Sequence, residues 1–391
     1  MIRFELPSLG ADVDEGTLLE WHIKPGDAVK RGQVVAVVDT SKAAVDVEIW
    51  HDGVVAELLV QPGQKIPVGT VLATLLEAGE SPMAGASPTA AVAAAVTRRA
   101  VSPSARRRAR ELGVDAERLQ GSGMQGSVTL ADVEAAAHVA TAAPASVPAA
   151  SGAIDRAQDM RKAIAAAMSR SKREIPHYYL SETIPMARAL AWLQQRNQGL
   201  PVDERLLPAV LMLKAVAVAL RRTPELNGFH HEGRFQAAAA VHAGVAISLR
   251  GGGLVAPALH DVGDKSLAAL MRELTDLVKR ARAGSLRSSE MSDPTVTVTN
   301  LGDQGVETVF GVIYPPQVAL VGFGRLVERP WVVDGSVQAT PVVCATLAAD
   351  HRASDGHRGA LFLAELRELL QQPQELDSPA PATSTSQASS P

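Results

Sequence analysis

The residues best suited to chemistry lie in the stretch ADHRASDG, at residues 349–356. His351 follows directly on an apolar run typical of a buried strand, and functional side chains often emerge where such an element ends. An arginine and two aspartates accompany it, ahead of a glycine. A histidine that exchanges a proton near neutral pH, with a carboxylate to hold the surrounding geometry, is what acyl transfer to a thiol requires. A lone histidine is usually structural, but the charged residues around His351 favour a catalytic role.

A second candidate lies in the stretch TVTVTNLGDQG, at residues 295–305. The alternation predicts a strand with Thr295, Thr297 and Thr299 on one face, and a polar strand face would explain the first two. Thr299 differs because the sequence Asn-Leu-Gly follows it, which predicts the end of the strand. A hydroxyl group at that place could donate a hydrogen bond to an oxyanion.

A third candidate is Lys42, which lies between two β-branched runs in the stretch VVDTSKAAVDVEI. A lysine taken alone is usually an ordinary solvated side chain. Here, however, residues 22–38 and 59–75 repeat the same Pro-Gly pair and the same later glycine. Each copy predicts a strand–turn–strand unit, and two copies predict a pair of small sheets that cover each other. Residues 39–43 join the two halves, which places Lys42 at an exposed hairpin tip as a handle for a group outside the domain.

The elements that position His351 and Thr299 begin near residue 155. Helical periodicity and apolar runs alternate irregularly, which predicts an α+β sandwich with a broad sheet. The predicted helices are 156–174, 205–223, 265–284 and the segment after Gly356, and the predicted strands are 241–249, 295–302, 317–324 and 341–349.

The middle of the chain predicts a small module between two linkers. Residues 80–100 and 137–154 are dominated by Ala, Pro, Ser and Gly, which indicates mobile linkers. Residues 101–136 predict two short helices with a minimal core, so a docking module is more plausible than a catalyst. Residues 373–391 end in a Ser, Thr and Pro-rich tail that we expect to be disordered.

Two features of this module bear on its partner. The stretch GSGMQG, at residues 121–126, matches a dinucleotide motif by letter, but it follows a helix and opens a short one instead of lying in a βαβ unit. We therefore expect no nucleotide there. Arginines that include Arg106 and Arg110 form a dense positive patch. Since no aromatic residues lie between them, the patch favours an acidic protein surface over nucleic acid.

Composition narrows the class further. The 391 residues suffice for two or three domains, and a net charge of −4 gives no global attraction for nucleic acid or an acidic membrane. The N-terminus lacks the apolar segment of a secretory signal, and Lys214 interrupts the longest apolar run. Cys344 is the single cysteine, expected to be a buried thiol without a disulfide partner. We expect a cytoplasmic protein.

In HHEGRF, at residues 230–235, adjacent histidines lack metal-ligand spacing and predict an exposed turn.

The repeat domain, the small basic module and the C-terminal segment, in this order along the chain, resemble dihydrolipoamide acyltransferases, the core components of 2-oxo acid dehydrogenase complexes. The supporting motifs are the repeat around DTSKA and, in the segment 155–372, RKAIAAAMSRSKREIPHYY, GLVAPAL, YPPQVALVGFG and DHRASDG. The resemblance implies a lipoyl domain at 1–79, a linker at 80–100, a peripheral-subunit-binding domain at 101–136, a linker at 137–154, a catalytic domain at 155–372 and a disordered tail at 373–391. It also implies an all-β flattened barrel or sandwich, a small all-α domain and an α+β domain like chloramphenicol acetyltransferase.

The resemblance implies roles for the candidate residues. Lys42 would carry lipoic acid through an amide bond, and His351 would take the proton from the coenzyme A thiol. Thr299 would stabilise the oxyanion. Asp355 would hold the active-site loop against a basic residue, for which Arg161 is our candidate.

The resemblance also implies partners. Arg106 and Arg110 would bind a partner enzyme, although Ser127 stands where the family has a further basic residue. A 2-oxo acid decarboxylase component and a dihydrolipoyl dehydrogenase are expected. Trimers with the active site between subunits would draw His351 and Thr299 from neighbouring chains and build a 24-mer or larger core.

Three alternatives stay open from the sequence. Acetyl is the expected acyl group, but branched-chain, succinyl and acetoin systems use the same machinery. A non-catalytic scaffold would keep the lipoyl and docking domains, although it would have no need of His351, Thr299 and Asp355. A biotin carrier shares the N-terminal fold, yet its lysine normally lies between two methionines, whereas Lys42 lies between serine and alanine.

Overall fold

A computed structural model describes most of the two terminal domains and a few residues between them. The described residues are 1–9, 13, 15–40, 44–76, 105, 107–109, 129–130, 133, 151–249 and 253–377. The chain divides into one unit of Met1–Pro82 with Arg156–Pro391, and a second of Met83–Asp155. Lys42, Arg106 and Arg110 lie outside the described residues, as does the predicted tail from residue 378.

The N-terminal domain is built from two small sheets around one apolar core, as the repeat predicts. One sheet has the order β1-β8-β6-β3, and the strands of the domain in the other have the order β5-β4-β2-β7. The strands are β1 (Ile2–Glu5), β2 (Glu15–Trp21), β3 (Ala28–Val29), β4 (Gln33–Asp39), β5 (Ala44–Ile49), β6 (Gly53–Leu58), β7 (Lys65–Pro67) and β8 (Val71–Leu76). Gly26 and Gly63, the equivalent Pro-Gly glycines of the two copies, both have positive φ, at 94° and 87°. That conformation favours glycine, which explains why the motif occurs twice.

The hairpin that carries Lys42 is defined by its two flanking strands. β4 and β5 pair antiparallel with Asp39 opposite Ala44, so residues 40–43 connect them. Val45, Val47 and Ile49 are fully buried along β5. The predicted strands are therefore confirmed, and the position of Lys42 in their connection follows from the register.

In the second unit, the described residues show two helical stretches, consistent with the predicted module. Ala105 and Ala109 are buried one helical turn apart, whereas Arg107 on the same helix is exposed. Val133, in the second stretch, is fully buried.

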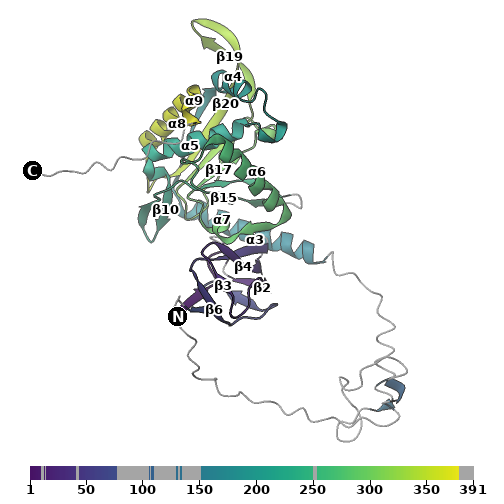
Figure 1. Ribbon diagram of the computed structural model, residues 1–391. Helices are drawn as coiled ribbons and strands as arrows, with labels where there is room; N and C mark the ends of the chain where they lie inside the picture. The colour runs from purple at the N-terminus through teal and green to yellow at the C-terminus, as the bar shows by residue number, and fades with distance from the viewer. Residues whose placement is uncertain are drawn as a thin grey trace, which may run out of the picture. The chain divides into compact units, whose positions relative to one another are not determined.

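The C-terminal domain is an α+β sandwich around a seven-stranded mixed sheet (Figure 1). The sheet has the order β15-β12-β17-β18-β20-β19, with β9 paired to β20. Its strands are β9 (His177–Pro185), β12 (Ala243–Val245), β15 (Ala258–Leu259), β17 (Val296–Asn300), β18 (Ala319–Phe323), β19 (Val327–Val333) and β20 (Ser336–Asp350). β20 is the centre of this region because it pairs with β18, β19 and β9 along its length.

Helices pack on the sheet and enclose the core. The helices are α3 (Ser151–Glu174), α4 (Ala187–Arg196), α5 (Pro208–Arg222), α6 (Leu267–Ala283), α7 (Ser288–Ser292), α8 (Gly356–Gln371) and α9 (Pro373–Leu376). Buried leucines of α5, α6 and α8 join valines of β17, β18 and β20 in one cluster. The four helices expected from periodicity are thereby confirmed as α3, α5, α6 and α8.

Several local expectations differ from the structure. β9 was not predicted, and the run at 241–249 forms two short strands, β12 and β13 (Ile247–Ser248). Leu376 of α9 is buried, so the packed region reaches past the expected boundary at residue 372. Cys344 is partly exposed instead of buried.

One other local expectation is confirmed. HHEGRF is a hairpin turn between β10 (Gly228–His231) and β11 (Arg234–Ala237), with Glu232 and Gly233 at positive φ. Among the described residues, no helix has the length and apolarity needed to cross a bilayer.

Candidate active site

His351 lies at the exposed end of the longest strand. It follows Asp350, the last residue of β20, and its backbone N–H donates to the carbonyl oxygen of Pro176 at 3.0 Å. The Tyr178 ring meets the imidazole edge-on, with centroids 5.4 Å apart at 71°. The imidazole is exposed, and no hydrogen bond to it is found within the described part of the chain. Its nitrogens therefore remain available to a substrate.

An ion pair between a buried aspartate and an arginine holds the backbone on either side of His351. The Asp350 side chain is 0% exposed, and the Arg352 guanidinium donates to both of its oxygens, through Nε at 3.0 Å and Nη2 at 2.7 Å. The Arg352 backbone N–H donates to the same carboxylate at 2.9 Å, and the carboxylate raises the pKa of Arg352. Asp350 and Arg352 were not among our predicted site residues, although they lie inside the signature stretch.

The far end of the loop is held by Asp355. Its carboxylate caps α8 by accepting from the backbone N–H of Arg358 at 2.9 Å, and this hydrogen bond lowers the pKa of Asp355. Ser354 beside it shares a hydrogen bond of 2.9 Å with the Tyr178 hydroxyl. The described contacts do not join Asp355 to Arg161, which is exposed on α3. In the single chain, Asp355 thus holds the loop through its own helix.

The three threonines of β17 have different surroundings. The Thr295 hydroxyl donates to Asn227 Oδ1 at 2.6 Å, and the Thr297 hydroxyl donates to Gln317 Oε1 at 2.7 Å. Both side chains are buried. Thr299 is only half-buried, and its hydroxyl has no hydrogen-bond partner among the residues that the structure describes. The prediction that Thr299 differs from its two neighbours is therefore supported by their packing.

Thr299 opens onto a largely apolar cavity of about 710 Å³. Ile164, Met168, Val309 and Tyr314 are among the residues that line it. Cavities of this size and polarity commonly hold small-molecule ligands whose few polar groups need precise partners.

The structure does not bring His351 and Thr299 together within one chain. Thr299 lies opposite Gly322 on β18, which lies opposite Thr346 on β20. His351 lies five residues beyond Thr346, just past the end of β20 at Asp350. With 3.3 Å per residue and 4.8 Å between strands, the two Cα atoms are about 19 Å apart. A single chain therefore cannot apply both side chains to one carbonyl group.

Sequence reasoning missed a histidine that holds the cavity wall. His177 Nε2 accepts from the backbone N–H of Ile313 at 3.2 Å, while Nδ1 lies 2.9 Å from the carbonyl oxygen of Ile175. Ser171 Oγ donates to the Ile313 carbonyl oxygen at 2.6 Å. Burial lowers the pKa of His177. The segment 309–314 that these bonds hold supplies four of the residues lining the cavity.

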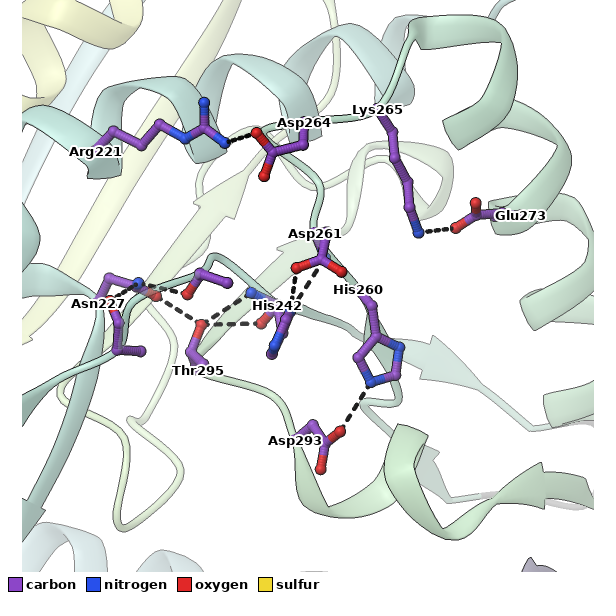
Figure 2. A network of polar contacts seen from close by, with 12 residues as sticks. Arg221, Asn227, His242, His260, Asp261, Asp264, Lys265, Glu273, Asp293 and Thr295 are labelled. Carbon is purple, nitrogen blue, oxygen red and sulfur yellow. Dashed lines mark hydrogen bonds and ion pairs between the residues drawn. The ribbon is translucent and has the colours of Figure 1, made fainter. Parts of the chain in front are cut away.

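Figure 2 shows a second polar network missed from the sequence. His242 Nδ1 accepts from the backbone N–H of Asp261 at 3.1 Å, and His260 Nε2 lies 3.0 Å from Asp293 Oδ2. The two imidazole centroids are 5.0 Å apart. Burial lowers the pKa of His242. Among the described residues, no group of three or more histidine, cysteine, aspartate or glutamate side chains could hold a metal ion.

Family models match three successive parts of the chain. The model of the 2-oxoacid dehydrogenases acyltransferase catalytic domain matches residues 153–377, which is more than half of the chain. The chain belongs to the 2-oxoacid dehydrogenase acyltransferase family. The model described as biotin-requiring enzyme, which also covers lipoyl domains, matches residues 2–75, and the e3 binding domain model matches residues 99–134. The three domain types expected in this acyltransferase are confirmed, in the expected order.

Similar proteins cover nearly all of the acyltransferase. The dihydrolipoyllysine-residue acetyltransferase component of the pyruvate dehydrogenase complex of Zymomonas mobilis is 31% identical, over 95% of this chain and 98% of that one. The lipoamide acyltransferase component of the branched-chain alpha-keto acid dehydrogenase complex of Pseudomonas aeruginosa is 33% identical, over 95% and 98%.

Solved structures agree on the catalytic fold. A probable dihydrolipoamide acetyltransferase from Listeria monocytogenes has a TM-score of 0.51 and 27% identity, covering 62% of this chain and 99% of that one. Dihydrolipoamide acetyltransferase from Azotobacter vinelandii has a TM-score of 0.52 and 26% identity, covering 56% and 90%. The expected acyltransferase fold is confirmed.

Proposed function

We propose that this acyltransferase moves an acyl group from a lipoyl group on Lys42 to coenzyme A, with His351 as the general base. One observation carries the proposal. The His351 imidazole is exposed and unbonded within the described residues, yet its loop is held on one side by the Asp350–Arg352 pair and on the other by Asp355. A free imidazole on a rigid support suits proton transfer, because the ring keeps its position while its nitrogens remain available.

The Azotobacter vinelandii enzyme supports these roles. Its crystallographic study concerns a serine, a histidine and an asparagine in the catalytic mechanism. Those three residues have the same separations along that chain as Thr299, His351 and Asp355 have here. Thr299 keeps the hydroxyl of the serine. Asp355 keeps an oxygen acceptor in place of the asparagine amide and uses it to cap α8.

The side chains then perform three tasks. His351 accepts the proton of the coenzyme A thiol, so that the sulfur can attack the acyl carbonyl carbon. Thr299 donates a hydrogen bond to the negative charge that develops on the carbonyl oxygen. His351 finally gives the proton to the departing sulfur as the original bond between that sulfur and the acyl carbon breaks, which leaves His351 neutral for the next turnover.

The distance of about 19 Å between the His351 and Thr299 Cα atoms supports an active site shared by two chains. We propose a trimer in which His351 of one chain faces Thr299 of the next, with trimers building a 24-mer or larger core. A structure of the cubic core of the pyruvate dehydrogenase multienzyme complex, 26% identical with a TM-score of 0.52, supports this assembly.

The N-terminal hairpin fits a lipoyl group. The register of β4 and β5 leaves Lys42 in a four-residue connection, where an amide-linked arm would extend away from the domain. When bound, the lipoyl group supplies the dithiol that bears the acyl thioester. Biotin is the alternative at Lys42, and the intact mass of the protein made in its native host distinguishes the two additions.

The middle domain supports a dehydrogenase partner. The match of residues 99–134 to the e3 binding domain model supports docking of dihydrolipoyl dehydrogenase. We propose that Arg106 and Arg110 contribute the positive charge for this docking. A 2-oxo acid decarboxylase component would supply the acyl group.

Acetyl is the acyl group that we propose, because the Zymomonas mobilis relative is a component of a pyruvate dehydrogenase complex. A branched-chain acyl group is the second candidate, since the Pseudomonas aeruginosa relative is 33% identical. Comparing kcat/KM for several acyl-CoAs with free dihydrolipoamide as acceptor decides between them.

The His351→Ala variant tests the mechanism. Loss of the general base should lower kcat for acetyl transfer between acetyl-CoA and dihydrolipoamide about 10²- to 10⁴-fold. Sedimentation should show the same assembly as the unmodified protein, because the side chain is exposed. An unchanged kcat would remove His351 from the mechanism. The control His357→Ala, an exposed histidine on the first turn of α8, should keep its activity.

A further inference from the structure

The edge of the lipoyl domain next to Lys42 forms a sheet with the catalytic domain. β16 (Ser285–Arg287) pairs parallel with β5, with Ser285 opposite Ala44 and Arg287 opposite Asp46. The five-stranded sheet thus has the order β16-β5-β4-β2-β7. Without β16, β5 would be an edge strand with unpaired backbone groups. Adding a strand to an exposed edge is a common mode of recognition.

Glu48 anchors this contact by its side chain and its backbone. Ser289 Oγ donates to Glu48 Oε2 at 2.5 Å, and the Glu48 backbone N–H donates to Ser288 Oγ at 3.3 Å. Arg287 Nη1 lies 3.9 Å from Glu48 Oε1. Only 5% of Glu48 is exposed in this arrangement. A carboxylate so deeply buried needs these partners, since an unpaired one would be costly.

The catalytic domain holds its side of the contact rigid. Glu290 accepts from both Arg280 Nη atoms, at 2.6 and 2.5 Å, and from the Arg287 backbone N–H at 2.9 Å. This pairing fixes the start of α7, where Ser288 and Ser289 lie. The contacts that hold this surface therefore come from the catalytic domain alone.

The same contact borders the cavity that Thr299 lines. Met291 of α7 packs against the apolar cores of both domains and lines the cavity together with Ser8 of the lipoyl domain. Docking at β16 and α7 consequently brings the domain that bears Lys42 to the wall of the cavity.

We propose that β16 and α7 are the docking surface for a lipoyl domain of this protein, and that Glu48 is its recognition residue. The inference rests on the proposed function, because docking matters only if the domain delivers an acyl thioester. Free dihydrolipoamide, which lacks the domain, would react at the same site without using this surface.

The proposal is tested by comparing two acetyl acceptors for the same full-length protein: its own lipoyl group and free dihydrolipoamide. The lipoylated chain, reduced with a phosphine, is mixed with acetyl-CoA, and acetylation of its own lipoyl group is followed by intact mass. Turnover of free dihydrolipoamide is measured in parallel. Glu48→Gln and Ser289→Ala should each slow acetylation of the lipoyl group about tenfold, because each weakens a hydrogen bond to a charged group. Turnover of dihydrolipoamide should be unchanged.

Glu57→Gln is the matched control, since Glu57 is exposed on β6 in the other sheet. An unchanged rate of lipoyl acetylation in Glu48→Gln and Ser289→Ala would overturn the docking surface, and so would an equal loss with both acceptors. If the unmodified protein turned over neither acceptor, the proposed function itself would fail.

Hydrogen exchange tests docking without any need for activity. Ser289→Ala lies in the catalytic domain, so it cannot unfold the lipoyl domain directly. It should nevertheless speed amide exchange in the peptide covering β5, because the β16 partner is lost more often. Exchange in β5 equal to that of the unmodified protein would overturn the proposal.

Discussion

At the scale of single residues, the site is distinguished by polar groups that the fold leaves unused. The hydroxyl groups of Thr295 and Thr297 donate hydrogen bonds to Asn227 and Gln317, whereas that of Thr299 has no hydrogen-bond partner within the described residues. The His351 imidazole is exposed and also has no hydrogen-bond partner there, whereas the Asp350 carboxylate beside it is paired with Arg352. Since buried polar groups are nearly always paired, an available one at a cavity is informative.

Substitution of Thr299 separates its hydroxyl from its packing. Thr299→Val should lower kcat for acetyl transfer about 10²-fold or more, as loss of one oxyanion donor does in other enzymes, with little change in KM. Thr299→Ser should keep most of the activity because the hydroxyl remains. Steady-state kinetics with acetyl-CoA and dihydrolipoamide measures both. Equal activity of Thr299→Val and the unmodified protein would exclude a hydrogen bond to the reacting oxygen.

At the scale of elements, the cavity wall depends on side chains that hold a loop by its peptide groups. His177 and Ser171 bind the N–H and the carbonyl of Ile313, which is fully buried. His177 comes from the start of β9 and Ser171 from the end of α3. Their pairing fixes the segment 309–314 against two elements that precede it by more than a hundred residues, so no local pattern could have predicted it.

His177 should make the stability of the catalytic domain depend on pH. Burial lowers its pKa below the ordinary 6.5, and the charges of Lys172 and Arg352 lower it further, whereas the hydrogen bond to the Ile175 carbonyl and the charge of Asp350 oppose them. The folded state therefore favours the neutral ring, so this stabilisation is present above pH 6.5 and is lost as the pH falls through the lowered pKa. His177→Ala should reduce the free energy of unfolding by about 1–2 kcal/mol at pH 8 and by less at pH 5.

Ser171→Ala is the matched control for this pH dependence. It removes the other hydrogen bond to Ile313 but no titratable group, so its destabilisation should be the same at both pH values. Denaturant titrations of the three proteins at pH 5 and pH 8 supply the comparison. A constant difference between His177→Ala and the unmodified protein would show that the imidazole does not titrate against this contact.

At the scale of the whole molecule, the register of the sheet supports the proposal that two chains share the active site. β17, β18 and β20 place Thr299 level with Thr346, far from His351 at the end of β20. The strands are continuous there, so no small movement could join the two residues. An interface in which different patches of two copies meet generates a closed ring when the rotation between copies closes, and a trimer is such a ring.

Mixed assemblies test the shared site. His351→Ala and Thr299→Val chains are each expected to be nearly inactive, but equal mixtures assembled together should recover about a quarter of the unmodified activity. That fraction follows because one site in four pairs an intact His351 from one chain with an intact Thr299 from the next. Co-expression with two affinity tags isolates the mixtures. No recovery in verified mixed assemblies would place both residues in the same chain.

The sequence by itself determined the domain order, the repeat that builds the lipoyl fold, the helices of the catalytic domain and the candidate residues His351, Thr299 and Lys42. These rest on local signals: periodicity, Pro-Gly turns and residues at strand ends. Only the tertiary structure showed that Thr299 alone among its neighbours keeps a usable hydroxyl, that Asp350 is paired, and that β16 meets β5. Those facts depend on which distant residues come into contact, and a contact between segments far apart in the chain leaves no periodic trace in either segment.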